Sequence, residues 1–561
     1  MRNKATAPKN ISNLLRMVTE NKICLPSFQR DFVWTPTQIA KLMESIVRHY
    51  PIGTLMLLKK EGNPDLRAEP FLDGHYGDFN PQFYVIDGQQ RLKTLLFALK
   101  PPTNPENQYH HLQHRYRFYF KVDMKLKEIL KSEEAEKLTF IKPARNDDPL
   151  EQDLEHDKEE LGRTKQLPLS VIYEQDESRW LNVFPPRFRR TYGKNVRDLR
   201  RQILSYSVPV ETLQYKLTER QHSNVFALIN SEGTGLSEFE LAAGRLYPVK
   251  MKELWREANE KKIKEYGIDP TYILKVMLLI NNQNAEVSSR AFRRIRWRYM
   301  RNGRFDTAQF KQDWRVSTKF INMALSEFEA QFGVMNKRYL PFSPMVVTYA
   351  AILHYLQVVK KYSPDKEKRI NSKLKKWYWA SVVNQRYKAG TNSVIRKDYQ
   401  RLKEWIEPRK WRTPPRFAVK MTMDELERLI ARTRNGADAV YRAIVCLPNI
   451  QERFDIYSGH AFSSGKVNDH HIYPRKRLEE QGYEDDEINQ VANWVITCER
   501  ANKQLQHDWP WKHLARVAKR HLKKYFIPPE ILKSRPTFRE FMRCRRTSLA
   551  KKVALLLRNG E

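Results

Sequence analysis

Four polar residues in the C-terminal part of the chain have the types and spacing of a hydrolytic centre. His470 and His471 are adjacent, Asn493 follows after a loop, and Asn502 comes nine residues later. Phosphodiester hydrolysis requires a base that deprotonates water and a cation that stabilises charge on the phosphate. A neutral histidine is such a base at cellular pH, and oxygen ligands helped by one imidazole suit Mg²⁺ or Mn²⁺. The four residues therefore indicate metal-assisted hydrolysis of a phosphodiester.

Short elements of secondary structure must bring these residues together. The segment Val467–Pro474 reads as a strand that ends at Pro474, because proline cannot donate a hydrogen bond to a neighbouring strand. A loop follows, Asn493–Thr497 reads as a second short strand, and Glu499–Leu505 reads as the start of a helix. The predicted order of strand, loop, strand and helix can gather a base, an orienting amide and a metal ligand.

The same motifs resemble the HNH, or ββα-metal, nuclease family. The family pattern is an acidic residue or histidine, then His-Ile-x-Pro, then an Asn-led strand, and finally Asn or His on a helix; here it is matched by His470, His471–Pro474, Asn493–Ile496 and Asn502. The resemblance implies that His471 is the general base, that His470 and Asn502 are metal ligands, and that Asn493 orients His471.

One departure concerns the first metal ligand. Many relatives have Asp where His470 stands, and here Asp469 lies one position earlier. Neighbouring residues on a strand face opposite sides, so Asp469 and His470 cannot both reach one metal ion without a bulge. We assign His470, which directly precedes the base as in the family, and keep Asp469 as the alternative. A lone histidine is usually a buried, hydrogen-bonded side chain, and it is the ordered set that favours catalysis.

A second group of polar residues lies near the N-terminus, in Leu25–Trp34 and Tyr84–Leu92. In the second segment an apolar run leads into Asp87 and Gly88, which form turns readily, and then into Gln90 and Arg91. Glycine permits close approach of the backbone, and the planar fork of arginine fits phosphate. The first segment contributes two further polar residues, Gln29 and Arg30. Taken alone, these residues predict a phosphate or nucleotide pocket, or else only a turn and a structural hydrogen-bonded pair.

These two segments resemble motifs of the ParB/sulfiredoxin-like N-terminal domain of GmrSD-type restriction proteins. That family has Pro-x-Phe-Gln-Arg, then Asp-Gly-Gln-Gln-Arg, then an Asn-x-x-Gly-x-x-Leu element, which Asn230–Leu236 matches in this chain. Members often end in an HNH domain. The resemblance implies that a nucleoside triphosphate is bound and hydrolysed, and it places the site at the following residues: Gln29, Arg30, Asp87, Gly88, Gln90 and Arg91.

Charge and composition favour a polyanionic partner. The chain of 561 residues has a formal net charge of +36. A protein this basic commonly binds nucleic acid, although the charge could also serve solubility or an acidic partner. The four cysteines form no Cys-x-x-Cys pair, which fits buried thiols in a reducing compartment. We find no signal peptide and no apolar run long enough to span a bilayer, so we expect a cytoplasmic protein with no membrane role.

We expect an α+β multidomain protein with three parts. Residues 1–245 are predicted to form the ParB/sulfiredoxin-like α/β domain, with an inserted segment at about 101–165. Residues 246–410 are predicted to be largely helical and to couple the two ends, and residues 411–561 to form the ββα-metal HNH nuclease domain. Within the middle part, Arg290–Arg304 alternates arginines with aromatic residues. That pattern suits either nucleic-acid contact or an amphipathic helix whose aromatic residues face the core.

Together these features predict a nucleotide-regulated, metal-dependent DNA endonuclease that acts in antiviral defence as a restriction enzyme for modified DNA. Two alternatives stay open: an RNA-cleaving toxin, and a nucleic-acid-binding regulator whose HNH centre is vestigial. A single HNH centre makes one cut per encounter, so a double-strand break requires either a homo-oligomer or sequential nicks.

Overall fold

The computed structural model divides the chain into two compact units, Met1–Lys250 and Met251–Glu561. The break lies close to the boundary expected after residue 245, and residues on both sides of position 410 belong to the second unit. The structure describes the chain except residues 1–3, 27–31, 62–67, 70, 72–80, 101–115, 124–138, 144–162, 174–185, 214–236, 247–248, 282–286, 288–290, 293–294, 296–297, 302–303, 363, 408–416, 418, 420, 435, 437, 451, 463–466, 500, 502–504, 506–507, 531–533 and 560–561.

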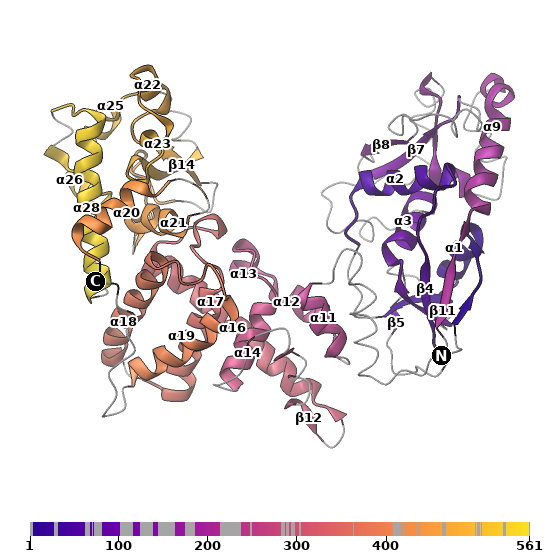
Figure 1. Cartoon of the computed structure of the whole chain (residues 1–561), viewed down its shortest axis with the longest axis horizontal. Helices are drawn as coiled ribbons and strands as arrows, with labels where there is room; N and C mark the ends of the chain where they lie inside the picture. The colour runs from indigo at the N-terminus through magenta and orange to yellow at the C-terminus, as the bar shows by residue number, and fades with distance from the viewer. Residues whose placement is uncertain are drawn as a thin grey trace. The chain divides into compact units, whose positions relative to one another are not determined.

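The first unit is built on a six-stranded mixed sheet with the order β1-β11-β4-β6-β3-β5 (Figure 1). Its strands are β1 Lys4–Thr6, β3 Ile23–Pro26, β4 Leu55–Lys59, β5 Ala68–Glu69, β6 Phe83–Asp87 and β11 Val210–Leu213. A smaller sheet consists of β7 Tyr116–Lys121, β8 Thr139–Pro143 and β9 Gln166–Pro168, and β2 Lys9–Asn10 pairs with β10 Ser207–Val208. The apolar run that leads into Asp87 in the sequence corresponds to β6.

Helices pack on these strands and enclose one apolar core. Those that contribute to this core are α1 Ile11–Thr19, α2 Pro36–Val47, α3 Gln89–Leu99, α7 Leu169–Tyr173 and α9 Pro186–Ser205. Helix α11, Glu238–Arg245, comes last in the unit. Helix α2 begins with a capping box in which Thr35 and Gln38 bond to each other's backbone N–H, and Pro36 follows the cap. These are the start signals expected for a helix in this part of the sequence. The buried faces of α1, α2 and α3 meet the strands in the core.

The second unit begins with a helical bundle. Its elements are α12 Met251–Ala258, α13 Lys261–Glu265, α14 Thr271–Asn281, β12 Met300–Arg301, β13 Arg304–Phe305, α16 Thr307–Phe332, η3 Lys337–Tyr339, α17 Met345–His354, η4 Tyr355–Lys360, α18 Pro364–Val383 and α19 Thr391–Ile406. Of the aromatic residues predicted either to contact nucleic acid or to face the core, Phe292 and Tyr299 are buried. Tyr299 also donates a hydrogen bond to Asp313, at 2.6 Å. The described aromatic residues of that stretch therefore belong to the core.

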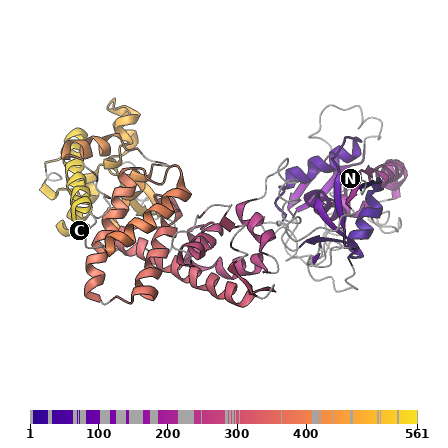
Figure 2. The same cartoon turned by 60° about the horizontal axis from the view of Figure 1, so that its bottom comes forward.

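The C-terminal part of the same unit carries the two strands predicted for the hydrolytic centre. Its elements are α20 Met423–Arg432, α21 Ala439–Cys446, η5 Leu447–Asn449, β14 Val467–His471, α22 Arg475–Glu480, α23 Asp485–Ile488, η6 Val491–Asn493, β15 Trp494–Cys498, α25 Pro510–Leu514, α26 Lys519–Lys524 and α28 Phe538–Asn559. The last helix, drawn in yellow, lies against both α18 and α20 (Figures 1 and 2). The helical bundle and the strand pair are thus packed together.

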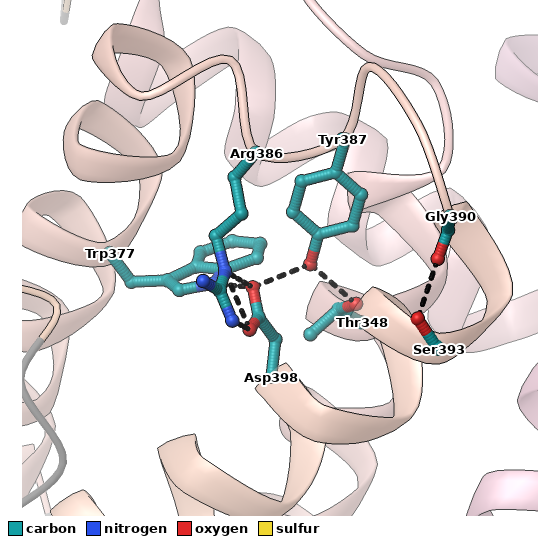
Figure 3. Close-up of polar contacts among 7 residues, drawn as sticks. All are labelled: Thr348, Trp377, Arg386, Tyr387, Gly390, Ser393 and Asp398. Carbon is teal, nitrogen blue, oxygen red and sulfur yellow. Dashed lines mark hydrogen bonds and ion pairs between the residues drawn. The ribbon is translucent and has the colours of Figure 1, made fainter.

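A buried ion pair holds three segments of the bundle together. The carboxylate of Asp398 on α19 is fully buried and accepts hydrogen bonds from Arg386 Nε at 2.9 Å and Nη2 at 2.5 Å. The Trp377 indole on α18 and the Tyr387 hydroxyl each donate to the same carboxylate, at 3.0 Å (Figure 3). Because the charged oxygens are fully used, the pair satisfies the hydrogen-bonding need that accompanies charge burial.

Removing this carboxylate should be costly. We expect Asp398→Ala to lower the free energy of unfolding of the second unit by about 3–5 kcal/mol, because it leaves the guanidinium and two other donors without their acceptor. Urea unfolding followed by tryptophan fluorescence measures the change. Ser393→Ala is the matched control, since its hydroxyl donates only to the exposed Gly390 carbonyl at 2.9 Å (Figure 3). Equal stability losses in the two variants would contradict a central role for Asp398.

Candidate functional site

The strand pair β14–β15 presents the predicted catalytic residues. It is antiparallel, and its register places His470 opposite Val495 and His471 opposite Trp494. Glu499, Ala501 and Leu505 are helical, as expected for the segment after the second strand, but Asn502 lies outside the described residues. The structure therefore brings His470 and His471 onto one short antiparallel strand pair, with Asn493 in η6 directly before its second strand.

The imidazole of His471 is fixed on two sides. Its ring centroid lies 3.6 Å from that of Trp494, at an interplanar angle of 38°. Its Nε2 lies 3.1 Å from Oδ1 of Asn489. Burial lowers the pKa of His471 to about 4, against the opposing effect of the hydrogen bond with Asn489. The ring is therefore neutral at cellular pH.

Asn493 acts on the backbone beyond His471 rather than on its ring. Its fully buried side chain accepts a hydrogen bond from the Tyr473 N–H at 2.9 Å and donates to the carbonyls of Tyr473 and Ile488 at 3.2 and 3.1 Å. It thereby fixes the turn after β14, while the amide in contact with His471 is that of Asn489. The sequence motif offers no signal for Asn489, because its place depends on the path of the loop between the strands.

Asp469 and His470 have different surroundings, as neighbours on a strand must. The Asp469 carboxylate is 3% exposed and bonds to Arg338 Nη2 at 2.5 Å and to the Tyr339 hydroxyl at 2.8 Å. Burial and this carboxylate raise the pKa of Tyr339, so its hydroxyl remains a donor. The ring of His470 instead packs edge-on against Tyr457, with centroids 5.4 Å apart. Asp469 thus ties β14 to the helical bundle.

Two further residues hold the second strand. The Asp455 carboxylate, 1% exposed, accepts from the Thr497 hydroxyl at 2.7 Å and from the Cys498 N–H at 2.6 Å. From α28, the buried Arg545 donates through Nη1 to the carbonyls of Ala492 and Trp494 at 2.6 and 3.0 Å. Burial lowers the pKa of Arg545 to about 10, which leaves it charged at neutral pH. Neither residue belongs to the local motif, so the sequence did not point to them.

No group of three or more His, Cys, Asp or Glu side chains that could hold a metal ion occurs within the described part of the chain. The predicted ligand pair consists of His470 and Asn502, an imidazole and an amide oxygen. This donor set is chemically suited to Mn²⁺ or Mg²⁺ assisted by water and phosphate oxygens. Asp469 is already engaged by a guanidinium and a phenol and presents no comparable donor.

In the first unit, the guanidinium of Arg91 forms hydrogen bonds with other groups of the protein. Its Nη1 donates to the Ile52 carbonyl at 2.7 Å, and its Nη2 donates to the Thr54 carbonyl at 3.0 Å and to Asp87 Oδ2 at 2.9 Å. The loop it binds turns at Gly53, where φ is +84° and a Cβ atom would lie 2.0 Å from the guanidinium. Arg91 therefore clamps the loop before β4 against the end of β6.

The other predicted residues of this site surround the start of α3. Gly88 is the N-cap, with φ +91°, and a Cβ there would lie 2.2 Å from the Leu55 side chain, so glycine is required. Gln90 is buried, and its Oε1 accepts from the Val33 N–H at 3.0 Å. Asp87 keeps a side chain that is 40% exposed. Gln29 and Arg30, and the Asn230–Leu236 element, lie outside the described residues.

The four cysteines are free thiols; Cys24 and Cys446 are buried, as expected, whereas Cys498 and Cys544 are partly exposed. No helix in the described ranges is both long enough and apolar enough to cross a membrane.

If Arg91 is a structural clamp, Arg91→Lys should destabilise the first unit although it keeps the charge. We expect a loss of about 1.5–3 kcal/mol in the free energy of unfolding, because lysine carries its three donors on one atom and lacks the wide planar fork with which Arg91 reaches two carbonyls and a carboxylate. Chemical denaturation followed by far-UV circular dichroism measures it. Arg16→Lys, at an exposed helix position, is the control. An unchanged stability for Arg91→Lys would argue that the fork serves a ligand instead.

The low pKa of His471 predicts a particular dependence of stability on pH. The unfolded imidazole binds a proton near pH 6.5 and the folded one only near pH 4, so the unfolded state binds more protons between these values. His471 should therefore cost the protein stability as the pH falls from about 6.5 to about 4. The free energy of unfolding of the metal-free wild-type protein should therefore fall relative to that of His471→Gln as the pH is lowered across this range. Parallel curves would show that His471 is not held neutral by burial.

Comparison with known proteins supplies relatives for most of the chain. Residues 11–247 match the family described as GmrSD restriction endonuclease, N-terminal domain. An uncharacterized protein of Methanocaldococcus jannaschii is 24% identical over 525 residues, which is 90% of this chain and 86% of that protein. The first unit is thus similar to the N-terminal domain of a restriction endonuclease, and the similarity to a protein of unknown role extends through the strand pair.

Proposed function

We propose that this chain is a restriction endonuclease of GmrSD type, which cuts DNA with an HNH centre in β14 and β15. The observation that carries the proposal is the imidazole of His471 at the end of β14, neutral through burial and fixed by Trp494 and Asn489. The similarity of residues 11–247 to a restriction endonuclease domain supports DNA as the substrate and defence as the role.

His471 is suited to deprotonate water. With the Asn489 amide oxygen facing Nε2, that nitrogen carries the proton and Nδ1 is left as the acceptor. A phosphate brought close to the ring would raise its pKa from about 4 and make it a stronger base. In this proposal the base therefore becomes stronger when the substrate arrives.

The metal ion belongs to the same proposal. His470 and Asn502 would hold Mg²⁺ or Mn²⁺, which when bound supplies positive charge to the scissile phosphate. Asp469 is left out, because its buried carboxylate is already bound by Arg338 and Tyr339. Its role is to position β14, and with it both histidines.

The first unit would regulate cleavage through a nucleoside triphosphate. Asp87, Gly88 and the start of α3 would face the phosphates together with Gln29 and Arg30, and Gln90 and Arg91 would shape the site through their bonds to Val33 and to the Ile52–Thr54 loop. A basic nuclease endangers the DNA of its own cell, so dependence on nucleotide and on DNA modification is a sensible safeguard.

Cleavage of unmodified and phage-derived modified DNA, with Mg²⁺ or Mn²⁺ and with or without nucleotide, tests the proposal. We expect the wild-type chain to cut and His471→Ala to lose at least about 100-fold in rate, as removal of a general base does. His513→Ala is the matched control. His513 lies on α25, and its Nε2 is 3.1 Å from Oδ2 of Asp508. Because His471→Ala removes a ring that packs against Trp494, circular dichroism of the variant is needed to separate a loss of catalysis from a loss of fold.

Each other outcome has a definite meaning. Cleavage by His471→Ala at the wild-type rate would refute the HNH assignment. Degradation of RNA alone would keep the catalytic residues and replace restriction by a toxin-like role. Tight DNA binding without cleavage under any condition would indicate a regulator with a vestigial centre. Cleavage that ignores both nucleotide and modification would remove the regulatory role of the first unit.

A further inference from the structure

One helix of the first unit carries a row of exposed cations. Helix α9, Pro186–Ser205, packs against α1, α2 and α7 along one outer side of the unit (Figure 1). Val196, Leu199 and Ile203 on its inner face are buried. Five cationic residues on its other face are exposed, and we call them the α9 ridge: Arg187, Arg190, Lys194, Arg197 and Arg201.

The spacing of the ridge is regular. Successive members are three, four, three and four residues apart, which is the period that keeps side chains on one narrow stripe of a helix. At 1.5 Å of rise per residue, the stripe from Arg187 to Arg201 is about 21 Å long. The cations therefore form a straight row and not a diffuse basic surface.

The ridge is not neutralised within the described part of the chain. None of the five cations forms an ion pair with a described carboxylate, and Asp198, the single acidic residue in the sequence of α9, is half-buried. Like charges three or four positions apart destabilise a helix. A row of cations that the described residues leave uncompensated is best explained by a polyanion that compensates it.

We propose that the α9 ridge binds the phosphate backbone of duplex DNA, as an anchoring surface separate from the β14–β15 centre. Along one strand of duplex DNA the phosphates are roughly 3.4 Å apart in the direction of the axis, so a ridge of about 21 Å spans about six of them. Arginine and lysine side chains on a rigid helix can meet successive phosphates without reading bases. This inference rests on the proposed function only for the choice of DNA among polyanions.

The proposal also assigns a use to the first unit beyond nucleotide binding. A contact to the backbone alone gives affinity without sequence specificity. DNA held on the ridge therefore stays near the chain while modification is sensed elsewhere. The ridge would set how strongly binding depends on salt, since each phosphate contact releases counterions.

Fluorescence anisotropy with a labelled duplex of about 20 base pairs, longer than the ridge, tests the proposal. The protein is the full chain carrying His471→Ala, in EDTA, so that no cleavage interferes. A triple variant, Arg190→Gln, Lys194→Gln and Arg197→Gln, should raise Kd about tenfold or more. The slope of log Kd against log salt should fall by about 2.7, since each lost contact removes about 0.9.

A matched control removes the same charge from the same unit. Arg16→Gln, Lys41→Gln and Lys100→Gln change three exposed cations on α1, on α2 and at the end of α3. The control should bind DNA within about twofold of the parent, with an unchanged salt slope. Circular dichroism on both triple variants establishes that α9 is still folded.

The outcomes separate this inference from the proposed function. Equal weakening by the two triple variants, or no weakening by the ridge variant, would overturn the ridge. A loss confined to RNA or to anionic lipid vesicles, with DNA binding intact, would overturn the choice of DNA. A wild-type chain that binds DNA through the ridge but never cuts it would refute the nuclease and leave the ridge standing.

Discussion

The strand pair that carries the histidines depends on a charge buried among backbone carbonyls. Arg545 reaches from α28 to the carbonyls of Ala492, Trp494 and Tyr525, and it remains charged despite its burial. Moving a guanidinium out of water is unfavourable unless several good acceptors replace the water. The arrangement is therefore all or nothing: either α28, η6 and β15 meet in one geometry, or the charge is left unsatisfied. The ring of Trp494, against which His471 lies, is positioned as a result.

The same functional group has three uses in this protein. In Arg91 and Arg545, the guanidinium fork binds backbone carbonyls and fixes the path of the chain. In Arg386 and Arg338 it pairs with a carboxylate, and on α9 it faces solvent in a row. The net charge of +36 is thus not a measure of the surface available for nucleic acid. Only the arginines and lysines that the fold leaves uncompensated can attract a polyanion.

Local features of the fold were accessible from the sequence, and remote ones were not. The strands β14 and β15 could be predicted because Pro474 limits the first and apolar residues follow Asn493 in the second, although β14 ends at His471, three residues before the proline. The partner of Asp469 could not be predicted, because Arg338 lies 131 positions away and its approach depends on how η3 packs. Asn489 was missed for a related reason, since only the folded loop brings it to His471. The bonds from Arg91 to the Ile52–Thr54 loop were not predicted, because its place in the Asp-Gly-Gln-Gln-Arg motif indicated a contact with phosphate.

The bond between Asp469 and Arg338 limits how the chain can be divided or recombined. A fragment beginning at residue 411 would contain every HNH motif but would leave a nearly buried carboxylate without Arg338 and Tyr339. The smallest transplantable segment therefore starts no later than η3, well upstream of the recognisable motif. Recombination between relatives that exchanged only the C-terminal third would succeed only if the donor and recipient agreed at these positions. Arg338, Tyr339 and Asp469 should consequently be inherited as a set, although they are far apart in the sequence.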